Sequence, residues 1–396
     1  MSEGRENGEE MKILEVIDNY FPTVDGVVSV VHNYAVQLNR KAECTVLAPK
    51  YPNAPIAEDC ELIACKSVSG GKYGVRLPLP FFDAKLREIL KEREFDIIHC
   101  HSPVTLCAYI ERYAKKRGIP VIFTVHTKYH EEINAHVKSR LLRKIAIGYI
   151  ISNMRKADAC WAVSEGAKKM LKEDYRVDTP CKVVPNGAEL GEYNISDEEI
   201  AEVKEEYGIK DTDFVALTVG RLVAVKNFHM AIDAVKILAD EGIPVRLIMV
   251  GSGDCEKELK KLAEGYGLKE EIIFTGWIKE KRKLAALYSA ANLFLMPSTF
   301  DTSSLAVKDA YATALPVLAI KGSSPADGIE DGKNGFLSEA DTVAFANRIK
   351  DIYKDTVKIA EIGKAGQKEL YKSWEDITDE VLELYKETLN QIKQTK

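Results

Sequence analysis

"DFVALTVG", residues 213–220, is the stretch that decides the fold, because it restarts a pattern that an acidic, polar segment at 189–208 interrupts. The pattern consists of short β-branched runs separated by helical stretches. The runs lie at 12–18, 43–49, 96–101, 120–126, 159–164 and 181–186, and again at 213–220, 245–251, 271–277, 293–298 and 316–320. Apolar strands that alternate with helices are typical of parallel sheets covered on both faces. We therefore predict an α/β fold with two doubly wound, Rossmann-like domains.

Length and composition agree with a two-domain enzyme. A chain of 396 residues is long for one core. Hydrophobic residues make up 46% and charged residues 29%, and the net charge of −6 gives no general attraction to nucleic acid. Basic residues outnumber acidic ones up to residue 190, whereas acidic residues dominate after it. The first half is therefore expected to carry the surface for an anionic partner.

The N-terminus, the apolar runs and the cysteines together predict a cytoplasmic protein. Its first ten residues are polar and acidic and do not resemble a signal peptide, so we expect a disordered tail at 1–11. No apolar run reaches the roughly 20 residues that span a bilayer. The 8 cysteines form no C-x-x-C pair, which indicates reduced thiols rather than a disulfide framework.

Cationic residues follow the strand at 213–220. Ligands of doubly wound sheets bind beyond the carboxyl ends of the strands, and this strand ends at Gly220, with Arg221 and Lys226 after it. An arginine fork and a lysine point charge suit the oxygens of a diphosphate. The alternative is a pair of solvated cations in a loop.

The next strand runs into a tight turn, Gly251-Ser252-Gly253. A nicotinamide fingerprint requires another glycine at position 256, where the chain has Glu256. The first strand lacks the fingerprint too, and the sequence has no Walker lysine motif. These absences weigh against hydride transfer and ATP hydrolysis.

Two aspartates stand out in "PSTFDTSSLAVKDAYATALPV", residues 297–317. The residues between the strand and the next helix are of capping types: Thr302, Ser303 and Ser304. If the helix begins here, eight positions at about 100° each bring Asp309 to within about 80° of Asp301. Both carboxylates could then accept hydrogen bonds from one hydroxyl-rich ligand, such as a sugar. The alternative is that Asp301 caps the helix and Asp309 is a solvated surface residue.

These motifs resemble the retaining glycosyltransferases of family 4, which have the GT-B fold. The second half does so through VGRLVAVKN, the GSG turn, FTGWIKEKRKLAALYSAANLFLMPS, the two spaced acids and DGIEDGKNGFL. The first half does so through FPTVDGVVSVVHNYA, DIIHCHSP, FTVHTKYHE, AVSEGAKKML and VVPNGAEL. The resemblance implies an acceptor-side domain at 12–190, a nucleotide-sugar domain at 191–370, and a C-terminal helix at 371–396 that returns to the first domain.

The resemblance also implies roles for individual residues. Arg221 and Lys226 would hold the diphosphate and stabilise charge on the leaving group. Asp301 would bond the sugar hydroxyls, Asp309 the ribose, and His126 would position the sugar. The remaining donor contacts would come from Asp25, Gly26, Gly220, Gly251, Gly253, Thr302, Ser303, Ser304 and Leu305.

The sequence departs from the family pattern at these positions. Both acids are usually Glu, and Asp301 and Asp309 are one methylene shorter. Ser304 and Ala314 stand where the family commonly has Gly, and Val225 stands where it has Glu. The shortened acids leave three alternatives open: a shifted donor, a bulkier sugar, or weak activity.

Family resemblance further implies retention at the anomeric carbon without a protein nucleophile, the β-phosphate taking the acceptor's proton. A UDP-sugar would be the donor, with glucose as its hexose. No metal or other cofactor is expected, since no D-x-D stands at a suitable strand end. His99 and His101 would lie on one face of a strand, which suggests a metal pair. The sequence offers no evident third ligand, and HxH before Ser-Pro is itself a family signpost, so we predict no metal site.

The basic segment at 137–156 gives information about the acceptor. Residues 137–156 contain six basic residues and no acid, interleaved with apolar ones: Lys138, Arg140, Arg143, Lys144, Arg155 and Lys156. A cationic amphipathic helix suits anionic lipid headgroups, although it could equally be a core helix with a solvated face.

FPTVDGVVSVV and FTVHTKYHEEI most resemble the membrane-associated diacylglycerol glucosyltransferases of the family. The resemblance implies transfer of glucose to diacylglycerol or a glycolipid by a protein peripheral to the inner face of the plasma membrane. The alternatives are a transferase for a soluble sugar or peptide, a nucleotide-sugar epimerase, and an inactive binding module.

Overall fold

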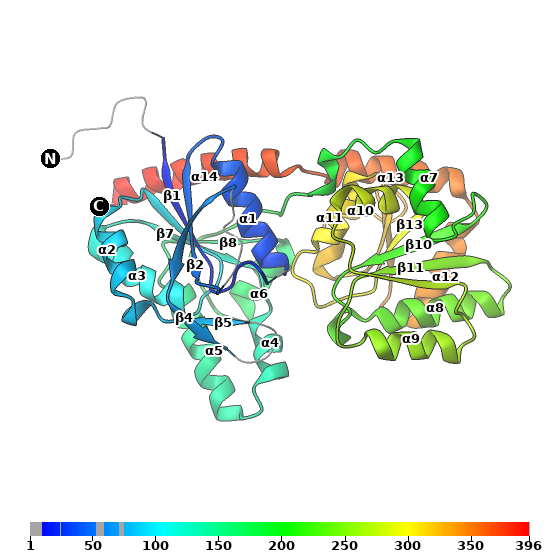
Figure 1. The fold of residues 1–396 in the computed structure, drawn as a ribbon, viewed down its shortest axis with the longest axis horizontal. Helices are drawn as coiled ribbons and strands as arrows, with labels where there is room; N and C mark the ends of the chain where they lie inside the picture. The colour runs from blue at the N-terminus through cyan, green and yellow to red at the C-terminus, as the bar shows by residue number, and fades with distance from the viewer. Residues whose placement is uncertain (1–9, 24, 53–58, 71–74, 396) are drawn as a thin grey trace. The chain divides into compact units, whose positions relative to one another are not determined.

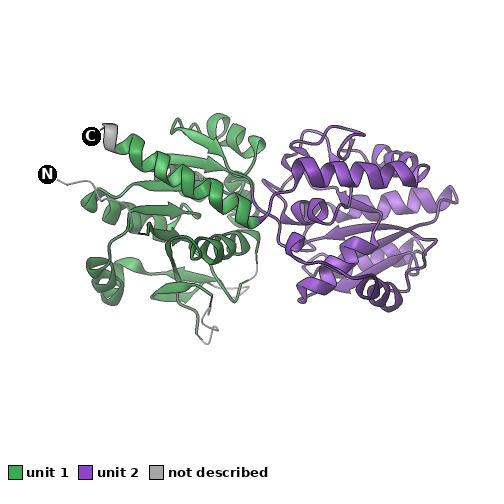
Figure 2. Cartoon of the chain, turned by 90° about the horizontal axis from the view of Figure 1, so that it is seen from above, with its two compact units in different colours: residues 1–185, 374–396 green, residues 186–373 purple. Residues whose placement is uncertain are grey.

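A computed structural model describes residues 10–23, 25–52, 59–70 and 75–395. The chain divides into two compact units, Met1–Pro185 with Trp374–Lys396, here unit 1, and Asn186–Ser373, here unit 2 (Figure 2). The sequence placed these divisions at 190/191 and 370/371. Apart from residues 10 and 11, the tail expected at 1–11 lies outside the described residues. Each unit is an α/β domain built on a parallel sheet, as predicted.

The sheet of unit 1 has seven strands within the described residues, and all neighbouring strands are parallel. In spatial order they are β3 (Glu61–Cys65), β2 (Glu43–Pro49), β1 (Lys12–Val16), β6 (Ile97–Cys100), β7 (Val121–Val125), β8 (Ala159–Ala162) and β9 (Cys181–Val183). The sequence predicted every one of these except β3, an edge strand with exposed positions. A separate antiparallel hairpin pairs β4 (Ser67–Ser69) with β5 (Arg76–Pro78).

Helices cover both faces of this sheet (Figure 1). They are α1 (Gly26–Leu38), α2 (Ala84–Glu92), α3 (Thr105–Arg117), α4 (Tyr129–His136), α5 (Arg140–Met154), α6 (Glu165–Glu173) and α14 (Trp374–Thr395). Side chains of α2, α3, α5 and α6 form one core with Leu14 and Val16 of β1. The C-terminal helix α14 packs against α1 and buries Trp374 and Tyr385. Because Leu14 and Val16 face the first core, Glu15 between them faces the side of α1 and α14.

Unit 2 repeats the design with a parallel sheet of six strands among the described residues. In spatial order they are β12 (Ile272–Gly276), β11 (Val245–Val250), β10 (Phe214–Val219), β13 (Leu293–Met296), β14 (Val317–Ile320) and β15 (Phe336–Ser338). From β10 the chain builds outward through β11 and β12, and then returns to the other side of β10 with β13. The strand order therefore reverses between β10 and β13, which is where ligands of such sheets bind.

The helices of unit 2 are α7 (Asp197–Glu206), α8 (Phe228–Asp240), α9 (Glu256–Gly265), α10 (Lys281–Ala290), α11 (Leu305–Ala312), α12 (Thr342–Tyr353) and α13 (Thr356–Leu370). Helices α8, α9, α12 and α13 contribute to one core, and α10 and α11 to the other. The acidic segment at 189–208 contains α7, which begins with a capping box between Ser196 and Glu199.

Within the described part of the chain, no helix combines the length and the apolar character that crossing a bilayer requires.

Candidate functional site

Two loops meet at the strand reversal of unit 2. The first follows β10 and the second, from Pro297, follows β13. The Ser298 hydroxyl donates to the Val225 carbonyl oxygen at 3.3 Å, and the Asn227 side-chain amide donates to the Pro297 carbonyl oxygen at 3.4 Å. These bonds fix the two loops against each other at the carboxyl ends of neighbouring strands.

The loops bring together two residues that the sequence singled out. Lys226 Nζ forms an ion pair and a hydrogen bond with Asp301 Oδ1, and the side chains are only 22% and 11% exposed. Arg221 lies in the same loop as Lys226 and is exposed. The structure therefore concentrates two cations and a carboxylate where ligands of doubly wound sheets bind.

Polar atoms at this place lack protein partners. Asp301 Oδ2 and Ser303 Oγ are buried and have no hydrogen-bond partner among the described residues. A buried polar atom left unpaired costs about 1–3 kcal/mol, so such atoms require an explanation. Both atoms lie on the loop that leads into α11, and hydroxyl groups of a ligand would satisfy them.

The start of α11 corrects the expected geometry of the two aspartates. The helix begins at Leu305, and Ser304 occupies its cap position without a side-chain capping bond. Residues 301–304 therefore form a loop, and the helical angle calculated from Asp301 does not apply. Asp309 is the fifth residue of α11, about one turn in rather than two.

Asp309 is buried, so the interpretation of it as a solvated surface residue is wrong. It is 9% exposed, and its Oδ1 accepts hydrogen bonds from the backbone N–H groups of Glu189 and Leu190, at 2.9 and 3.0 Å. Burial, together with the charge of Glu189, raises the pKa of Asp309 to about 7. Asp309 is thus anchored to the backbone of residues 189–190, whereas Asp301 pairs with Lys226.

A raised pKa makes the stability of the protein pH-dependent. The folded state keeps the Asp309 proton up to about pH 7, while the unfolded state loses it near the ordinary aspartate pKa of 3.8. The contribution of this group to the unfolding free energy therefore falls as pH rises between those values. We expect Asp309→Asn, whose side-chain oxygen can still accept both bonds, to flatten the dependence of unfolding free energy on pH from 4 to 7. Denaturant titrations at pH 4 and pH 7 measure it. An equal pH dependence in variant and wild type would contradict the assignment.

The predicted glycines form the contact between the first loop and the turn after β11. A Cβ on Gly251 would lie 1.9 Å from the Gly220 carbonyl oxygen, and one on Gly253 would lie 2.4 Å from the Leu222 carbonyl oxygen. Leu222 N–H also donates to the Ser252 carbonyl oxygen at 3.0 Å. Gly251 and Gly253 therefore position the loop that carries Arg221. Direct contact of these glycines with a donor stays a prediction.

Unit 1 contains the other predicted site residues. Asp25 is the N-cap of α1: its Oδ1 accepts from the Val28 N–H at 2.9 Å, and its Oδ2 accepts from the Asn19 side chain at 3.0 Å. Gly26 begins the helix, and a Cβ there would meet nothing within 4 Å. Asp25 thus has a capping role, and Gly26 leaves open space at the start of α1.

Sequence reasoning did not identify Asp18, which follows β1 at the strand reversal of unit 1. Its Oδ1 accepts hydrogen bonds from the backbone N–H groups of Thr105 and Leu106, and its Oδ2 is buried without a partner among the described residues. Burial raises the pKa of Asp18 to about 7. The signal was an acid directly at the carboxyl end of a buried strand.

His126 lies just after β7 and is buried against His101. His126 Nε2 is 2.9 Å from His101 Nδ1, and His101 Nε2 is 2.5 Å from Glu15 Oε2. The sequence had suggested no third ligand for the pair His99 and His101. In the structure Glu15 supplies one, since single ligand atoms of the three residues lie within 4.8 Å of one another.

This cluster is better described as a hydrogen-bonded network than as a metal centre. His99 Nδ1 lies 2.7 Å from the Tyr385 hydroxyl, and His99 Nε2 lies 2.6 Å from Thr124 Oγ1. The same ring atoms that could coordinate an ion thus already have protein partners. Glu15 was missed in the sequence, where an acid inside the apolar run 12–16 was the available signal.

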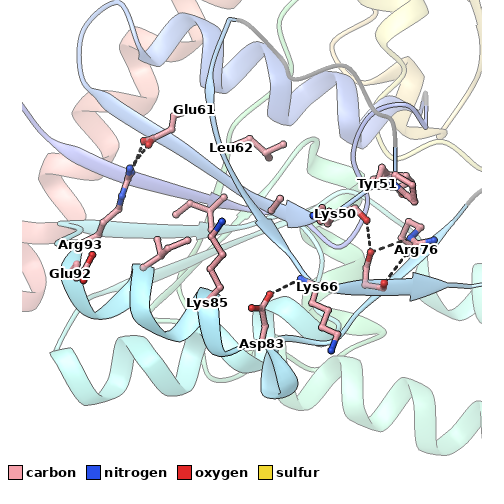
Figure 3. A pocket seen from close by; sticks show the side chains of 15 residues that line it. Lys50, Tyr51, Glu61, Leu62, Lys66, Arg76, Asp83, Lys85, Glu92 and Arg93 are labelled. Carbon is pink, nitrogen blue, oxygen red and sulfur yellow. Dashed lines mark hydrogen bonds and ion pairs between the residues drawn. The ribbon is translucent and has the colours of Figure 1, made fainter.

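A cavity of about 940 Å³ lies elsewhere in unit 1 (Figure 3). Cationic side chains line much of it: Lys50, Lys66, Arg76, Lys85 and Arg93. Arg93 pairs with Glu61, and Arg76 Nη2 donates to the Ser67 carbonyl oxygen at 2.8 Å. None of its lining residues was predicted to bind the donor.

Helix α5 has an exposed apolar side. Leu141, Leu142, Ile145 and Tyr149 are 68%, 57%, 59% and 44% exposed. The spacing places these side chains along one side of the helix.

The six predicted basic residues around α5 fall into two groups. Lys138, Arg140 and Lys144 are exposed. Arg143 donates to backbone carbonyls including that of Asn134, and Arg155 donates to that of Arg176. Lys156 donates to Asn153. Arg155 and Lys156 are exposed as well, and Arg143 is half-buried. A membrane-facing role for these six cations stays a prediction.

Comparisons with known proteins identify the family. Two family models match the chain, Glycosyltransferase Family 4 over residues 24–192 and Glycosyl transferases group 1 over residues 199–369. An alpha-monoglucosyldiacylglycerol synthase of Streptococcus pneumoniae is 28% identical, over 78% of this chain and 71% of its own length. The Acholeplasma laidlawii enzyme of the same name is 26% identical over 88% of each chain.

Two further similarities concern the donor and the fold. A GDP-mannose-dependent phosphatidylinositol monomannoside mannosyltransferase of Mycolicibacterium smegmatis is 23% identical, over 92% of this chain and 94% of its own length. The crystal structure of Anabaena HepE in complex with UDP-glucose superposes with a TM-score of 0.75 at 20% identity, covering 95% of this chain and all of that one. This superposition confirms the GT-B fold. Since the two family models together match most of both units, the chain belongs to the family 4 and group 1 glycosyltransferases.

Proposed function

We propose that this glycosyltransferase moves glucose from UDP-glucose to a hydroxyl group of a membrane lipid, such as diacylglycerol or a glycolipid, with retention of the anomeric configuration. The observation that carries the proposal is the exposed apolar side of α5, a helix that also carries the exposed residues Arg140 and Lys144. A soluble acceptor gives no reason for such a surface. The similarity to two diacylglycerol glucosyltransferases supports the same acceptor class.

The donor subsite is proposed at the strand reversal of unit 2. Arg221 and Lys226 supply positive charge for a diphosphate, which becomes more negative as the sugar leaves. Asp301 Oδ2 and Ser303 Oγ, buried without protein partners among the described residues, would bond sugar hydroxyls. Asp309 would contribute to the ribose contact from α11. HepE, which has the same fold, was crystallised with UDP-glucose.

A donor panel tests this assignment. The purified protein is incubated with UDP-glucose, UDP-galactose, UDP-N-acetylglucosamine or GDP-mannose, each with diacylglycerol vesicles, and nucleotide release is measured. We expect release from UDP-glucose to exceed release from the others. A preference for GDP-mannose would assign the donor of the mannosyltransferase relatives instead, and would overturn the choice of UDP-glucose while leaving the enzyme class intact.

Retention and independence from metal complete the proposal. NMR of the purified product should show an α-linkage from the α-configured donor, and a β-linkage would contradict retention. Activity should persist in EDTA, since the charge on the leaving diphosphate falls to Arg221 and Lys226. Loss of activity in EDTA with recovery on adding Mg²⁺ would show that a divalent cation shares that role.

We predict that two acidic substitutions on the exposed apolar side of α5 weaken binding to membranes. Leu141→Glu combined with Ile145→Glu places acids one turn apart on the exposed side of α5, where they oppose insertion and repel anionic lipid. We expect affinity for vesicles of anionic phospholipid to fall at least about tenfold, because each buried aliphatic side chain is worth about 1.5–3 kcal/mol. Vesicle sedimentation at low salt measures the change.

A matched control uses exposed valines of unit 2. Val343 and Val357 are 55% and 72% exposed. Val343→Glu with Val357→Glu adds the same charge and should leave vesicle affinity within about twofold of wild type. An equal loss in both double variants would attribute the effect to net charge, and no loss in the α5 variant would remove α5 from the membrane contact.

Two other functions give different results in the same assays. A nucleotide-sugar epimerase would convert the donor without any lipid product. An inactive binding module would bind nucleotide without turnover.

A further inference from the structure

The cavity of unit 1 is lined by the edge strand β3, by α2 and by the segments that follow β2 and β3. Its volume of about 940 Å³ falls in the range of small-molecule sites, roughly 300–1,000 Å³. Its lining contains five cations and three acids: Lys50, Lys66, Arg76, Lys85 and Arg93, against Glu61, Asp83 and Glu92. The cavity therefore has an excess of positive charge.

This charge is unevenly distributed along the cavity. Glu61 is the first residue of β3 and forms an ion pair with Arg93, and Glu92 directly precedes Arg93. Two of the three acids thus lie at the end of the cavity where β3 begins. The other end, here the cationic end, is where β3 finishes, and it contains four of the cations: Lys50, Lys66, Arg76 and Lys85.

Hydrogen bonds hold Arg76 in place at the cationic end. The Lys50 N–H donates to the Cys65 carbonyl oxygen at 2.7 Å, and the Ser67 hydroxyl donates to the Lys50 carbonyl oxygen at 2.5 Å. Arg76 Nε in turn donates to Ser67 Oγ at 3.1 Å, and Arg76 Nη2 donates to the Ser67 carbonyl oxygen at 2.8 Å. The half-buried guanidinium is therefore fixed in orientation, with N–H groups left for a ligand.

Asp83 joins two of the lysines to the same end of the cavity. Its Oδ2 accepts from the Lys66 N–H at 2.6 Å (Figure 3), and its Oδ1 accepts from the Leu86 N–H at 3.0 Å as the N-cap of α2. Lys85 lies in the first turn of this helix. Backbone groups thus occupy both carboxylate oxygens. The ammonium groups of Lys50, Lys66 and Lys85 are exposed and have no ion-pair partner in the described part of the chain.

We propose that the cationic end binds the phosphate group of a phosphate ester, whose organic part lies against Leu62 and Ile89. An oriented arginine fork and lysine point charges match phosphate oxygens. Leu62 and Ile89 are half-buried residues of the cavity wall, and the volume exceeds what phosphate alone requires. The ester is either an anionic phospholipid headgroup or a soluble metabolite, since both present the same group. The inference does not depend on the proposed function, because these residues take no part in the donor subsite.

Two binding measurements on the full chain distinguish the sources of phosphate. Equilibrium dialysis with radiolabelled glycerol 3-phosphate tests a soluble ester, and unlabelled glycerol is the uncharged competitor. Sedimentation with vesicles of phosphatidylcholine, with or without phosphatidic acid, tests a lipid headgroup. Both are carried out at low salt, where charge interactions are least screened. We expect saturable binding of the phosphate-bearing probe in at least one arm, without competition by glycerol and with little binding to phosphatidylcholine alone.

Substitutions within the cavity test where the probe binds. Lys66→Gln combined with Lys85→Gln removes two charged hydrogen-bond donors, and we expect affinity to fall at least about tenfold. Arg76→Lys keeps the charge but loses the fork, so it should weaken binding as well. The matched control is Lys169→Gln with Lys172→Gln in α6, where both lysines are exposed and lie outside the cavity. It removes the same charge and should leave affinity within about twofold of wild type.

Each outcome assigns or overturns the site. Cavity-dependent binding of glycerol 3-phosphate identifies a soluble ester, and cavity-dependent binding of phosphatidic acid vesicles identifies a lipid headgroup. Absence of binding in both arms would overturn the inference, as would an equal loss in both double variants. Binding that Lys226→Ala abolishes and the cavity variants do not affect would place the phosphate in the donor subsite instead. A protein that transfers glucose but fails these tests would lose this inference alone.

Discussion

Replacing Lys226 by alanine is expected to lower the kcat for sugar transfer by about 10²–10³-fold, the range measured when one charge-stabilising donor is removed from an active site. Lys226 lies at the strand reversal of unit 2 and pairs with Asp301. Its loss would remove positive charge from the leaving diphosphate and leave the Asp301 carboxylate without its partner. Steady-state transfer at saturating donor measures the effect.

The matched control is Lys236→Ala in α8. Lys236 pairs with Asp240 one turn away on the surface of the same unit, and such pairs contribute only about 0.3–0.5 kcal/mol. Its kcat should equal that of wild type. A Lys226→Ala enzyme that folds and retains more than half of the wild-type kcat would contradict the assignment of the donor subsite.

Replacing Gly251 by alanine is expected to reduce the unfolding free energy by about 2–4 kcal/mol, because the new Cβ meets backbone rather than a movable side chain. That Cβ would lie 1.9 Å from the Gly220 carbonyl oxygen, and the residue has φ of 135°, which strains any residue with a side chain. Since the displaced loop carries Arg221, we expect transfer activity to fall as well. Denaturant unfolding and transfer assays at low temperature measure the two effects.

Gly265→Ala, at the end of α9, is the control for this substitution. A Cβ there would meet nothing within 4 Å, and alanine favours helix over glycine. Its stability should equal or slightly exceed that of wild type. Equal stability of Gly251→Ala and Gly265→Ala would show that the contact between the two loops is looser than described.

The alternation of strands and helices could be predicted from the sequence because it depends on local patterning. All eleven quoted runs are strands, including 213–220, which became β10. The edge strands were missed because β3 has exposed positions and β15 is only three residues long, so neither forms a long apolar run. The family resemblance, rather than patterning, supplied the GT-B arrangement.

The site was predicted less completely, because its contacts join residues far apart in the sequence. Lys226 and Asp301 were both named, yet their pairing depends on β10 and β13 being neighbours. Asp309 was expected to face a ligand or solvent, whereas its Oδ1 accepts from the backbone at Glu189 and Leu190. A local sequence pattern cannot predict a hydrogen bond between residues that lie so far apart in the chain. Glu15 was missed for the same reason, since its partner His101 follows a different strand, β6.

One measurement tests the central claim most directly: formation of radiolabelled glycolipid from UDP-[¹⁴C]glucose by the purified protein, with vesicles of anionic phospholipid that contain or lack diacylglycerol. The account predicts labelled lipid only when diacylglycerol is present, and less of it with the Leu141→Glu, Ile145→Glu variant. Glucose transfer to a soluble sugar, with no labelled lipid under any vesicle condition, would contradict the account.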